Sequence, residues 1–528
     1  VMLNTPLSDT LALRAVLYGS YSDGFVDTPF APETDSLGSD NYGARVSLRY
    51  RPNDQLTVDA SVQYDDSSYA APLFAFEGSV AAGNPIAGNG TVPGNDVTRL
   101  NALLEVGYET NLGVFTSTTG YLESTLEGIE DFDFSPADES LLGRDNFQDT
   151  ISQEFRFESR DFAVGSGTVS FNLGANYSQT DSETQADFRV TDFFGAGPGA
   201  ANSLFTLDVE NSGVFGDVRW NPNDRLEIAL GGRYSYDNVR VDSGTITTGA
   251  AVGLLPSGSV SRSSTYSAFT PSLSIIYDWT NAISTSASYS TGYKPGGFAS
   301  SAAGTAFTEF GEENVENYEV GLKSSFFGGN LILNASAYSL DYRDIQVPVP
   351  FDPVTQTGGG VENAARAKSE GLELSFIATP IEGLTLNGAF GYVDARFTDY
   401  SNAPSGDLTG TPLPNAPRRT YSLSADYEFQ KKIRGLTPFL RGEFTGKSDF
   451  VSVPGSTILV GDYDLVNLRA GLRGERFNLV FFIENLLDEK YAVESVGGPA
   501  TPPPQFAGQA LVVPGESRKF GVVLSMTF

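Results

Sequence analysis

The residues that could bind a small solute are aromatic and cationic side chains placed where long polar connections meet regular segments. Tyr293, Lys294 and Phe298 combine ring faces with a positive charge within one run of six residues. Other cations have a similar placement and complete the candidate binding set: Arg343, Arg366, Lys368 and Arg396. The chain has a formal net charge of −32, so clustered cations would attract an anionic solute. The alternative is ordinary ion pairing between loops.

Missing residue types limit the chemistry further. The chain has no histidine and no cysteine, which excludes a Ser-His-Asp triad, imidazole metal ligands, disulfides and thiol chemistry. No Gly-x-Ser-x-Gly motif stands between a strand and a helix, and adjacent acids such as Asp65 and Asp66 are interpreted as loop charge. The sequence therefore predicts no enzyme, no catalytic residue, no metal site and no cofactor. The net charge also disfavours nucleic acid as a partner.

Regular alternation identifies the elements that must position the candidate residues. Leu56, Val58, Ala60, Val62 and Tyr64 alternate with polar residues, and the pattern recurs about twenty times. Successive side chains of a strand point to opposite faces, so each such segment has one apolar and one polar face. A large soluble all-β protein, such as a propeller or β-helix, would share this alternation. It would not need long strands joined by alternating short and long connections.

The connections alternate in length along the whole chain. Short turns rich in Asn, Pro, Gly and Asp are expected at residues 51–55, 111–113, 221–225, 279–281, 327–330 and 473–476. Long connections are expected at residues 22–41, 65–97, 122–147, 178–204, 237–265, 292–313, 343–361, 394–418, 446–462 and 491–517. No stretch reaches the ~18 apolar residues of a membrane helix. Short turns on one side and long loops on the other are typical of an outer-membrane β-barrel.

Counting the strands predicts the size of this all-β transmembrane antiparallel barrel. About twenty strands follow Leu11, residues 4–9 form one more short turn, and residues 1–3 form the tail of a descending strand. The full barrel is therefore expected to have 22 strands, in the size range that holds a plugged lumen. Residues 1–528 are predicted to form one transmembrane β-barrel domain. The first strand, most of the second and any export signal are expected upstream.

Side-chain types predict which face meets lipid. Tyrosines recur near strand ends in phase with the apolar positions, which suits a girdle at the lipid–water boundary: Tyr64, Tyr108, Tyr121, Tyr177, Tyr234, Tyr289 and Tyr427. Small or charged residues occupy the opposite face, as at Ala282, Ser284, Ser286, Ser288 and Ser290, and at Arg45, Ser47, Arg49 and Arg51. Val62 is accordingly predicted to face lipid, and Gln63 the lumen.

Several stretches resemble signatures of one known family. Residues 483–491 (IENLLDEKY) resemble the C-terminal signature of TonB-dependent outer-membrane receptors. Residues 314–322 (NVENYEVGL), 363–373 (NAARAKSEGLE) and 288–298 (SYSTGYKPGGF) resemble mid-barrel signatures, and residues 4–13 (NTPLSDTLAL) resemble the segment that leads into the third strand. The resemblance covers essentially the whole chain. Each motif also has a structural interpretation; Gly371, for example, permits close strand packing.

The resemblance implies active import across the outer membrane of a Gram-negative bacterium. In that family a plug domain blocks the lumen, an N-terminal box binds TonB, and external loops capture scarce solutes, often ferric siderophores and sometimes other solutes. Plug and box are absent from this sequence and are expected upstream. Further expected partners are outer-membrane lipid, lipopolysaccharide, a metal-chelate or other small-molecule substrate, and a surface lipoprotein or a larger complex.

Two questions stay open at the level of sequence. A passive porin or a structural outer-membrane component is the alternative to an active importer, and an upstream plug with a TonB box would discriminate between them. Acids in the predicted loops, such as Asp131, Asp133, Asp138 and Glu139, could hold divalent ions that bridge to lipopolysaccharide. The alternative is that they only keep solvated loops soluble.

Overall fold

The structure is a computed structural model of the whole chain. It describes all residues except 31–36, 71–73, 132–135, 137–139, 192–196, 250–256, 301–306, 349–350, 353–356, 359, 404–405, 457, 497–504, 506 and 528. Of the acids named above, Asp133, Asp138 and Glu139 lie outside the described residues.

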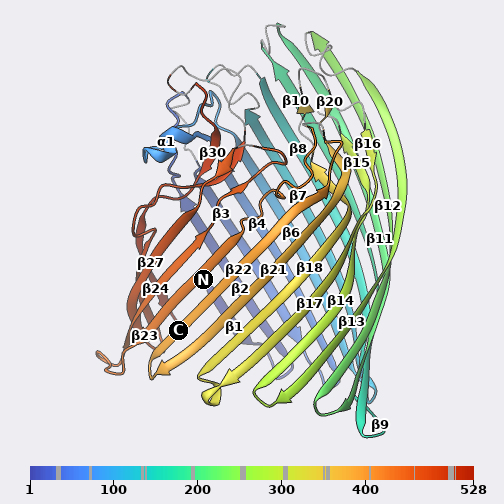
Figure 1. Cartoon of the computed structure of the whole chain (residues 1–528), viewed down its shortest axis with the longest axis vertical. Coiled ribbons are helices and arrows are strands. Elements are labelled where there is room, and N and C mark those ends of the chain that lie inside the picture. Colours follow the sequence, from blue (N-terminus) through green and yellow to red (C-terminus); the bar gives the residue numbers. More distant parts are fainter. Residues whose placement is uncertain are drawn as a thin grey trace.

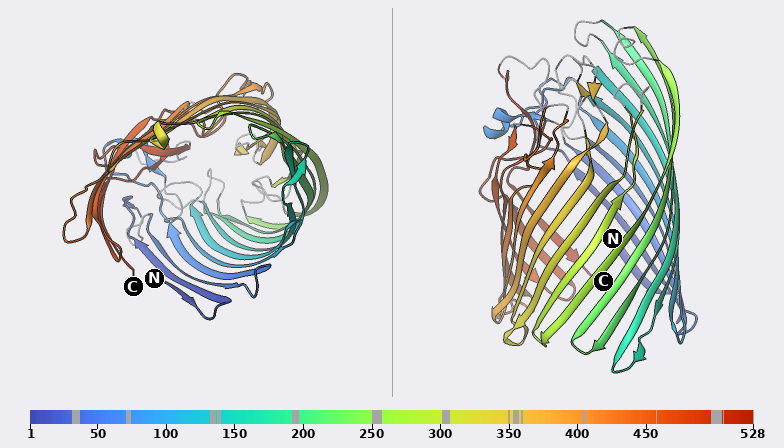
Figure 2. Two further views of the ribbon diagram at one scale, coloured as in Figure 1. Left: turned by 90° about the horizontal axis from the view of Figure 1, so that it is seen from below. Right: turned by 45° about the vertical axis from the view of Figure 1, so that its right-hand side comes forward.

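One antiparallel sheet of 22 strands forms a barrel wall around an open bore (Figure 1, Figure 2). Two of these strands are very short, so 22 minus 2 leaves twenty long strands, as predicted from the sequence. The short ones are β1 (Met2–Pro6) and β9 (Phe162–Val164). The long ones are β2 (Leu11–Ser22), β3 (Ser39–Tyr50), β4 (Leu56–Ala70), β6 (Gly94–Glu109), β7 (Gly113–Asp131), β8 (Ser140–Ser159), β10 (Gly167–Val190), β11 (Gly199–Asn223), β12 (Leu226–Gly249), β13 (Gly258–Thr280), β14 (Ile283–Lys294), β17 (Glu313–Phe326), β18 (Leu331–Pro348), β21 (Val361–Ile381), β22 (Leu384–Asp399), β23 (Arg419–Glu428), β24 (Thr437–Lys447), β27 (Tyr463–Arg473), β28 (Phe477–Glu484) and β31 (Lys519–Met526).

The remaining elements are short and belong to the connections. They are β5 (Ala75–Phe76), α1 (Glu77–Ala81), β15 (Gly297–Ser300), β16 (Phe307–Phe310), η3 (Phe327–Gly329), β19 (Phe351–Asp352), β20 (Thr357–Gly358), β25 (Phe450–Val451), β26 (Leu459–Val460), β29 (Ala492–Val496) and β30 (Leu511–Pro514). None of the described helices is long and apolar enough to cross a membrane.

Strand register gives the wall its two faces. Val62 pairs with Val46 on β3 and with Ala102 on β6, whereas Gln63 pairs with Arg45 and Asn101. Directly opposed residues point to the same side of a sheet, so apolar positions line up on one face and polar positions on the other. The apolar face is the outer one, because a membrane barrel turns it to lipid. Val62 is 51% exposed on the apolar face.

Short turns occur where the sequence predicts them, for example between Tyr50 and Leu56 and between Thr280 and Ile283. The opposite end differs from the expectation, because strands extend well into the predicted long loops. The hairpin β10–β11 runs as far as the pair Val190–Gly199, and β11–β12 as far as Gly199–Gly249. Apolar alternation marks only the lipid-facing part of a strand. Beyond it, hydrated polar segments still pair through their main chains, so the predicted boundaries were wrong there.

Small apolar clusters organise the external connections. Phe397 and Ala367, which pair across β21 and β22, are buried with Tyr400 and Leu408 of the segment that follows β22. This segment covers the inner face of both strand ends. In a second cluster, Val80 of α1 packs with Val512 of β30. Strand β30 is the middle strand of a three-stranded sheet with β5 and β29.

The two terminal strands lie at neighbouring positions of the wall (Figure 2). In the described part of the chain, β1 pairs only with β2, and β31 pairs only with β28. Nineteen long antiparallel strands separate β1 from β31, so both run in the same direction. Direct antiparallel pairing between them is therefore impossible, and both edges expose main-chain donors and acceptors.

Candidate solute-binding surfaces of the barrel

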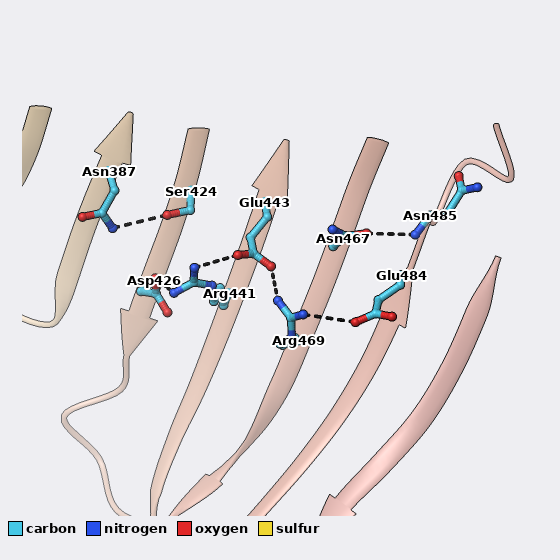
Figure 3. A network of polar contacts seen from close by, with 9 residues as sticks. All are labelled: Asn387, Ser424, Asp426, Arg441, Glu443, Asn467, Arg469, Glu484 and Asn485. Carbon is cyan, nitrogen blue, oxygen red and sulfur yellow. Dashed lines mark hydrogen bonds and ion pairs between the residues drawn. The ribbon is translucent and has the colours of Figure 1, made fainter. Parts of the chain in front are cut away.

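The inner face of the last strands carries a chain of alternating charges (Figure 3). It starts at Asp426 on β23, continues through Arg441 and Glu443 on β24 and Arg469 on β27, and ends at Glu484 on β28. Their strand neighbours of opposite parity include Leu440 and Phe481, which are among the exposed apolar residues. Alternation along β24 and β28 thus places the charges on the bore side.

Each arginine of this chain joins two carboxylates. Arg441 donates to Asp426 Oδ2 at 2.8 Å and to Glu443 Oε1 at 2.6 Å. Arg469 bonds the other oxygen of Glu443 and donates to Glu484 Oε1 at 3.2 Å. The side chains of Asp426 and Glu443 are only 19% and 20% exposed. Three acids and two bases leave one formal negative charge on this part of the bore wall.

A second polar network lies on the inner face of β10, β11 and β12. The Asn176 amide donates to Asn211 at 3.0 Å, and the Asn211 amide donates to Asp237 at 2.7 Å. Arg233 donates to Asn176 at 2.7 Å and stacks over Phe215, 5.5 Å from the ring centroid. This part of the bore wall therefore offers hydrogen-bond donors from its amides and from the Arg233 guanidinium, and an aromatic face from Phe215.

Three of the candidate residues lie close together in the chain at the rim, at the end of β14 and in the hairpin β15–β16. The Tyr293 hydroxyl is buried, and Asp237 of the second polar network is its leading charged neighbour. Lys294 pairs with Glu313 at the start of β17 and is exposed. Phe298 belongs to the hairpin β15–β16, and Phe310 of this hairpin accepts a hydrogen bond from Tyr266 at 3.4 Å. The structure therefore brings these three residues to one part of the rim, and Tyr293 reaches the bore-side residue Asp237.

The other four candidates lie on the outer face. Lys368 pairs with Arg396 across β21 and β22, one step from the buried inner pair formed by Ala367 and Phe397. Because neighbouring residues of a strand point to opposite sides, both cations point outward. Arg366 has the parity of Lys368, and Arg343 on β18 bonds the outer-face residue Glu316 at 2.7 Å. Contact between these cations and a solute stays a prediction, and their face is the one that carries the lipid-facing residues.

Sequence reasoning missed the charged chain from Asp426 to Glu484. A usable signal was present, because Arg441 and Glu443 stand two residues apart and thus share one strand face. Opposite charges at that spacing, repeated on the polar face of successive strands, predict cross-strand ion pairs. In the described residues, no group of three or more His, Cys, Asp or Glu is arranged to hold a metal ion.

The family-like segment after β28 has a structural role. Asn485, with a positive φ of 47°, donates to Glu489 O and Glu516 O, both at 3.0 Å. Asp488 accepts the Arg518 backbone N–H at 3.1 Å and pairs with Lys490 at 3.0 Å. These two contacts lower the pKa of the Asp488 carboxyl below its usual range. Together they fasten the turn to the beginning of the last strand.

Fold and wall chemistry define a transmembrane β-barrel with an apolar exterior and a polar, charge-paired bore. Residues 72–486 match the family described as TonB dependent receptor-like, beta-barrel, and the chain belongs to this family. Barrels of this family are Gram-negative outer-membrane proteins, which places this chain in that membrane. The family is made up of transporters and receptors.

Curated relatives match about half of the chain. The metal-pseudopaline receptor of Pseudomonas aeruginosa is 27% identical over 274 residues, 51% of this chain and 35% of its own length. The ferric-pyoverdine 358 receptor of Pseudomonas putida is 26% identical over 301 residues, 56% of this chain and 34% of its own length. The matched part thus spans about a third of the length of these relatives.

Solved structures match the whole barrel in fold. The ferric yersiniabactin uptake receptor of Yersinia pestis has a TM-score of 0.85 at 18% identity, covering 100% of this chain and 77% of that one. A siderophore receptor of Acinetobacter baumannii has a TM-score of 0.75 at 15% identity, covering 99% of this chain and 78% of that one.

Proposed function

We propose that this chain is the barrel of an active outer-membrane importer that binds a scarce metal chelate and is energised through TonB. The observation that carries the proposal is the family match over residues 72–486. Relatives named for metal-pseudopaline and for ferric-pyoverdine support a metal chelate of a small organic ligand as the solute class. The polar bore wall supports passage of a hydrophilic solute rather than a lipid.

We propose that the solute first meets the bore side of the rim at Tyr293, Lys294 and Phe298. An exposed ammonium beside aromatic rings suits an anionic chelate whose organic ligand presents flat or apolar surface. The Tyr293 hydroxyl next to Asp237 links this rim to the polar network of β10, β11 and β12. The solute would therefore pass from charged rim to amide-lined wall without leaving a polar surface.

We also propose that the bore holds a plug domain and that one further strand closes the wall. An open bore of this width would be a permanent hole, and the charge chain from Asp426 to Glu484 offers a polar surface for a plug to pack against. The edges of β1 and β31 run in the same direction, so one antiparallel strand between them would pair with both. TonB, through a box beyond this sequence, and a surface lipoprotein complete the proposed partners.

Uptake in cells tests the importer. The full-length protein is produced in a Gram-negative strain that lacks its own siderophore receptors, and the cells are supplied with radioactive iron bound to yersiniabactin, pyoverdine or citrate. We expect saturable uptake of one chelate that disappears when TonB is deleted. Equal uptake with and without TonB, together with entry of unrelated small solutes, would instead establish a passive pore.

A single variant tests the rim. Lys294→Ala removes the rim ammonium, and we expect the affinity for the transported chelate to fall about tenfold, the equivalent of about 1.4 kcal/mol. Lys431→Ala is the matched control, because Lys431 is an exposed lysine in the turn between β23 and β24 at the opposite end of the barrel. Unchanged affinity in Lys294→Ala would remove this residue from the site.

A further inference from the structure

The turn between β23 and β24 differs in charge from every other short turn of the barrel. Residues 429–436 (FQKKIRGL) contain Lys431, Lys432 and Arg434 and no acid, in a chain with 65 acidic and 33 basic residues. The other short turns each have no more bases than acids: residues 7–10, 51–55, 110–112, 160–161, 165–166, 224–225, 281–282, 327–330, 382–383 and 474–476. Residues 429–436 are called the basic turn below. Short turns of an outer-membrane barrel face the periplasm.

The basic turn bends away from the barrel wall. The Phe429 N–H donates to Pro438 O at 2.9 Å, and the next pairing is the bridge between Ile433 and Leu436. Residues 430–432 thus stand opposite the one residue between Leu436 and Pro438. An unequal count of this kind bends a hairpin. Accordingly, the turn that follows β23 projects sideways from the wall, at the lower left of Figure 1 and at the left edge of the view from below in Figure 2.

The tip and the base of the basic turn are both fixed. Ile433 and Leu436 exchange two main-chain hydrogen bonds, of 2.8 and 3.0 Å, around Arg434 and Gly435. These two tip residues have positive φ values of 52° and 84°, as in two-residue hairpin turns. At the base, the Leu436 side chain packs against Gly474 of the adjacent turn. Because the main chain is already ordered, binding at this turn would cost little further ordering.

The cations of the basic turn lack a counter-charge. Lys431, Lys432 and Arg434 are exposed and make no ion pair with any residue that the structure describes. The nearest acid in the sequence is Glu428, which shares the bore-side parity and is paired with Arg473. Three positive charges are therefore free to attract an anionic partner from outside the chain.

Exposed apolar side chains accompany these cations. Ile433 is 55% exposed and Phe429 is 43% exposed. The Phe429 ring meets the Tyr427 ring edge-on, with 4.8 Å between the centroids, and Tyr427 pairs with the exposed lipid-facing residue Leu440. The basic turn therefore starts at the lower border of the lipid-facing band and continues sideways from there. This is the level of the lipid headgroups in the periplasmic leaflet.

We propose that the basic turn binds the headgroups of anionic phospholipids in the periplasmic leaflet, with Phe429 and Ile433 at the border of the acyl chains. Clusters of Lys and Arg at this level are attracted to an anionic lipid surface, and apolar side chains beside them add contact with the interface. A turn that pointed straight into the periplasm would instead suit an acidic protein, and the sideways bend favours the leaflet. The basic turn lies at the opposite end of the barrel from the rim, so this inference goes beyond import and does not rest on it.

A fluorescent probe on the turn tests the proposal. This sequence contains no cysteine, so Gln430→Cys provides a unique labelling site within it. The full-length protein is labelled there with the fluorophore NBD and placed in phosphatidylcholine nanodiscs that contain increasing amounts of phosphatidylglycerol carrying a nitroxide quencher. A parallel series uses phosphatidylcholine with the same nitroxide. We expect phosphatidylglycerol to reach half quenching at an about tenfold lower fraction than phosphatidylcholine, and about 1 M salt to weaken this preference.

Two variants of the labelled protein locate the preference. The basic-turn variant combines Lys432→Gln and Arg434→Gln. The matched control combines Arg51→Gln and Arg225→Gln, two exposed cations of other turns at the same end, so both variants lose two positive charges. We expect the preference for phosphatidylglycerol to disappear in the basic-turn variant and to persist in the control. Thermal unfolding shows that each variant is folded.

Three results would overturn the proposal. Equal quenching of the unmodified protein by the two lipids would show that the turn does not select an anionic headgroup. Loss of the preference in both variants would show that overall charge, rather than the basic turn, attracts the lipid. Absence of quenching by either lipid would place the turn in water and would favour an acidic periplasmic protein as its partner.

Discussion

An arginine placed along β4 tests which face of the barrel meets lipid and how deep each residue lies. Leu56 pairs with Tyr108 near one boundary, and Tyr64 marks the other, eight residues further on. At about 3.3 Å per residue and a tilt of about 40°, these levels are roughly 20 Å apart across the membrane. Ala60 then lies about 10 Å below the Tyr64 level and Val62 about 5 Å below it.

The depth of each residue sets the expected cost. A lipid-facing arginine costs about 2–4 kcal/mol at the bilayer midplane and about 0–1 kcal/mol near the interfaces. We therefore expect Ala60→Arg to cost about 2–4 kcal/mol and Val62→Arg about 1–2 kcal/mol. Gln63→Arg should cost less than about 1 kcal/mol, because Gln63 faces the wet bore and already lies within hydrogen-bond distance of Asp65, at 2.9 Å.

Unfolding in urea from phosphatidylcholine vesicles measures these differences in the full-length protein. Trp220 and Trp279 are the two tryptophans of the chain, and both are exposed on the wall, so their fluorescence reports the loss of the barrel. The expected order of destabilisation is Ala60→Arg, then Val62→Arg, then Gln63→Arg. If Gln63→Arg were the most damaging, the assignment of the two faces would be reversed; equal costs at positions 60 and 62 would refute the depth calculation.

Three further perturbations have expected outcomes. Arg469→Met leaves Glu443 and Glu484 without the cation that they share. It should lower the free energy of unfolding by about 1–2 kcal/mol in the same urea assay. The control is Arg473→Met, which breaks an exposed ion pair and should lower that free energy by less than about 0.5 kcal/mol. Gly371→Val places a side chain against the ring of Tyr338 and should lower the free energy of unfolding by about 1–3 kcal/mol, measured by thermal unfolding. Gly244→Ala adds a methyl group in open space and should leave this free energy nearly unchanged. The pKa of Asp488 is lowered in the folded state, so its contacts stabilise the turn above an unfolded pKa of about 3.9 and are lost as the pH falls through the folded value. Protection factors of the turn amides, which are exchange rates corrected for the intrinsic effect of pH, should therefore fall in acid. Asp488→Asn should make these protection factors independent of pH in this range.

The sequence was sufficient for the architecture of the wall. Alternation at positions such as Val62 and Gln63 sets the face, and turn residues such as Asn53 and Asn223 set the strand ends. Both signals are local in the sequence. Each long strand pairs with the next long strand along the chain, so the faces and ends of the single strands define the barrel wall. At Gly371 the structure shows a cross-strand ring, that of Tyr338, in the space beside the glycine. The closer strand packing expected from the sequence stays a prediction.

The candidate site could be predicted only in part. Beyond the lipid-facing band, both faces of a strand are polar, so the alternation of apolar and polar residues no longer marks the two faces. Around Lys368 both faces of the strand are polar or small, so its face follows only from counting along the strand to Leu372 and Leu374. The structure supports that face, because Ala367 and Phe397, on the opposite side, are buried under the segment after β22. The charge chain through Glu443 and Arg469 also depends on cross-strand register, which a single strand does not encode.

The unequal strand lengths give the external surface a directional profile. Strands β10 to β13 have 23–25 residues, whereas β23, β24, β27, β28 and β31 have 8–11 (Figure 1). A difference of about 14 residues raises one side of the rim by roughly 35 Å at barrel tilt. Large particles such as antibodies and phage would therefore meet the tall hairpins first. Binding by antibodies should therefore concentrate on these hairpins rather than on the side formed by the short strands.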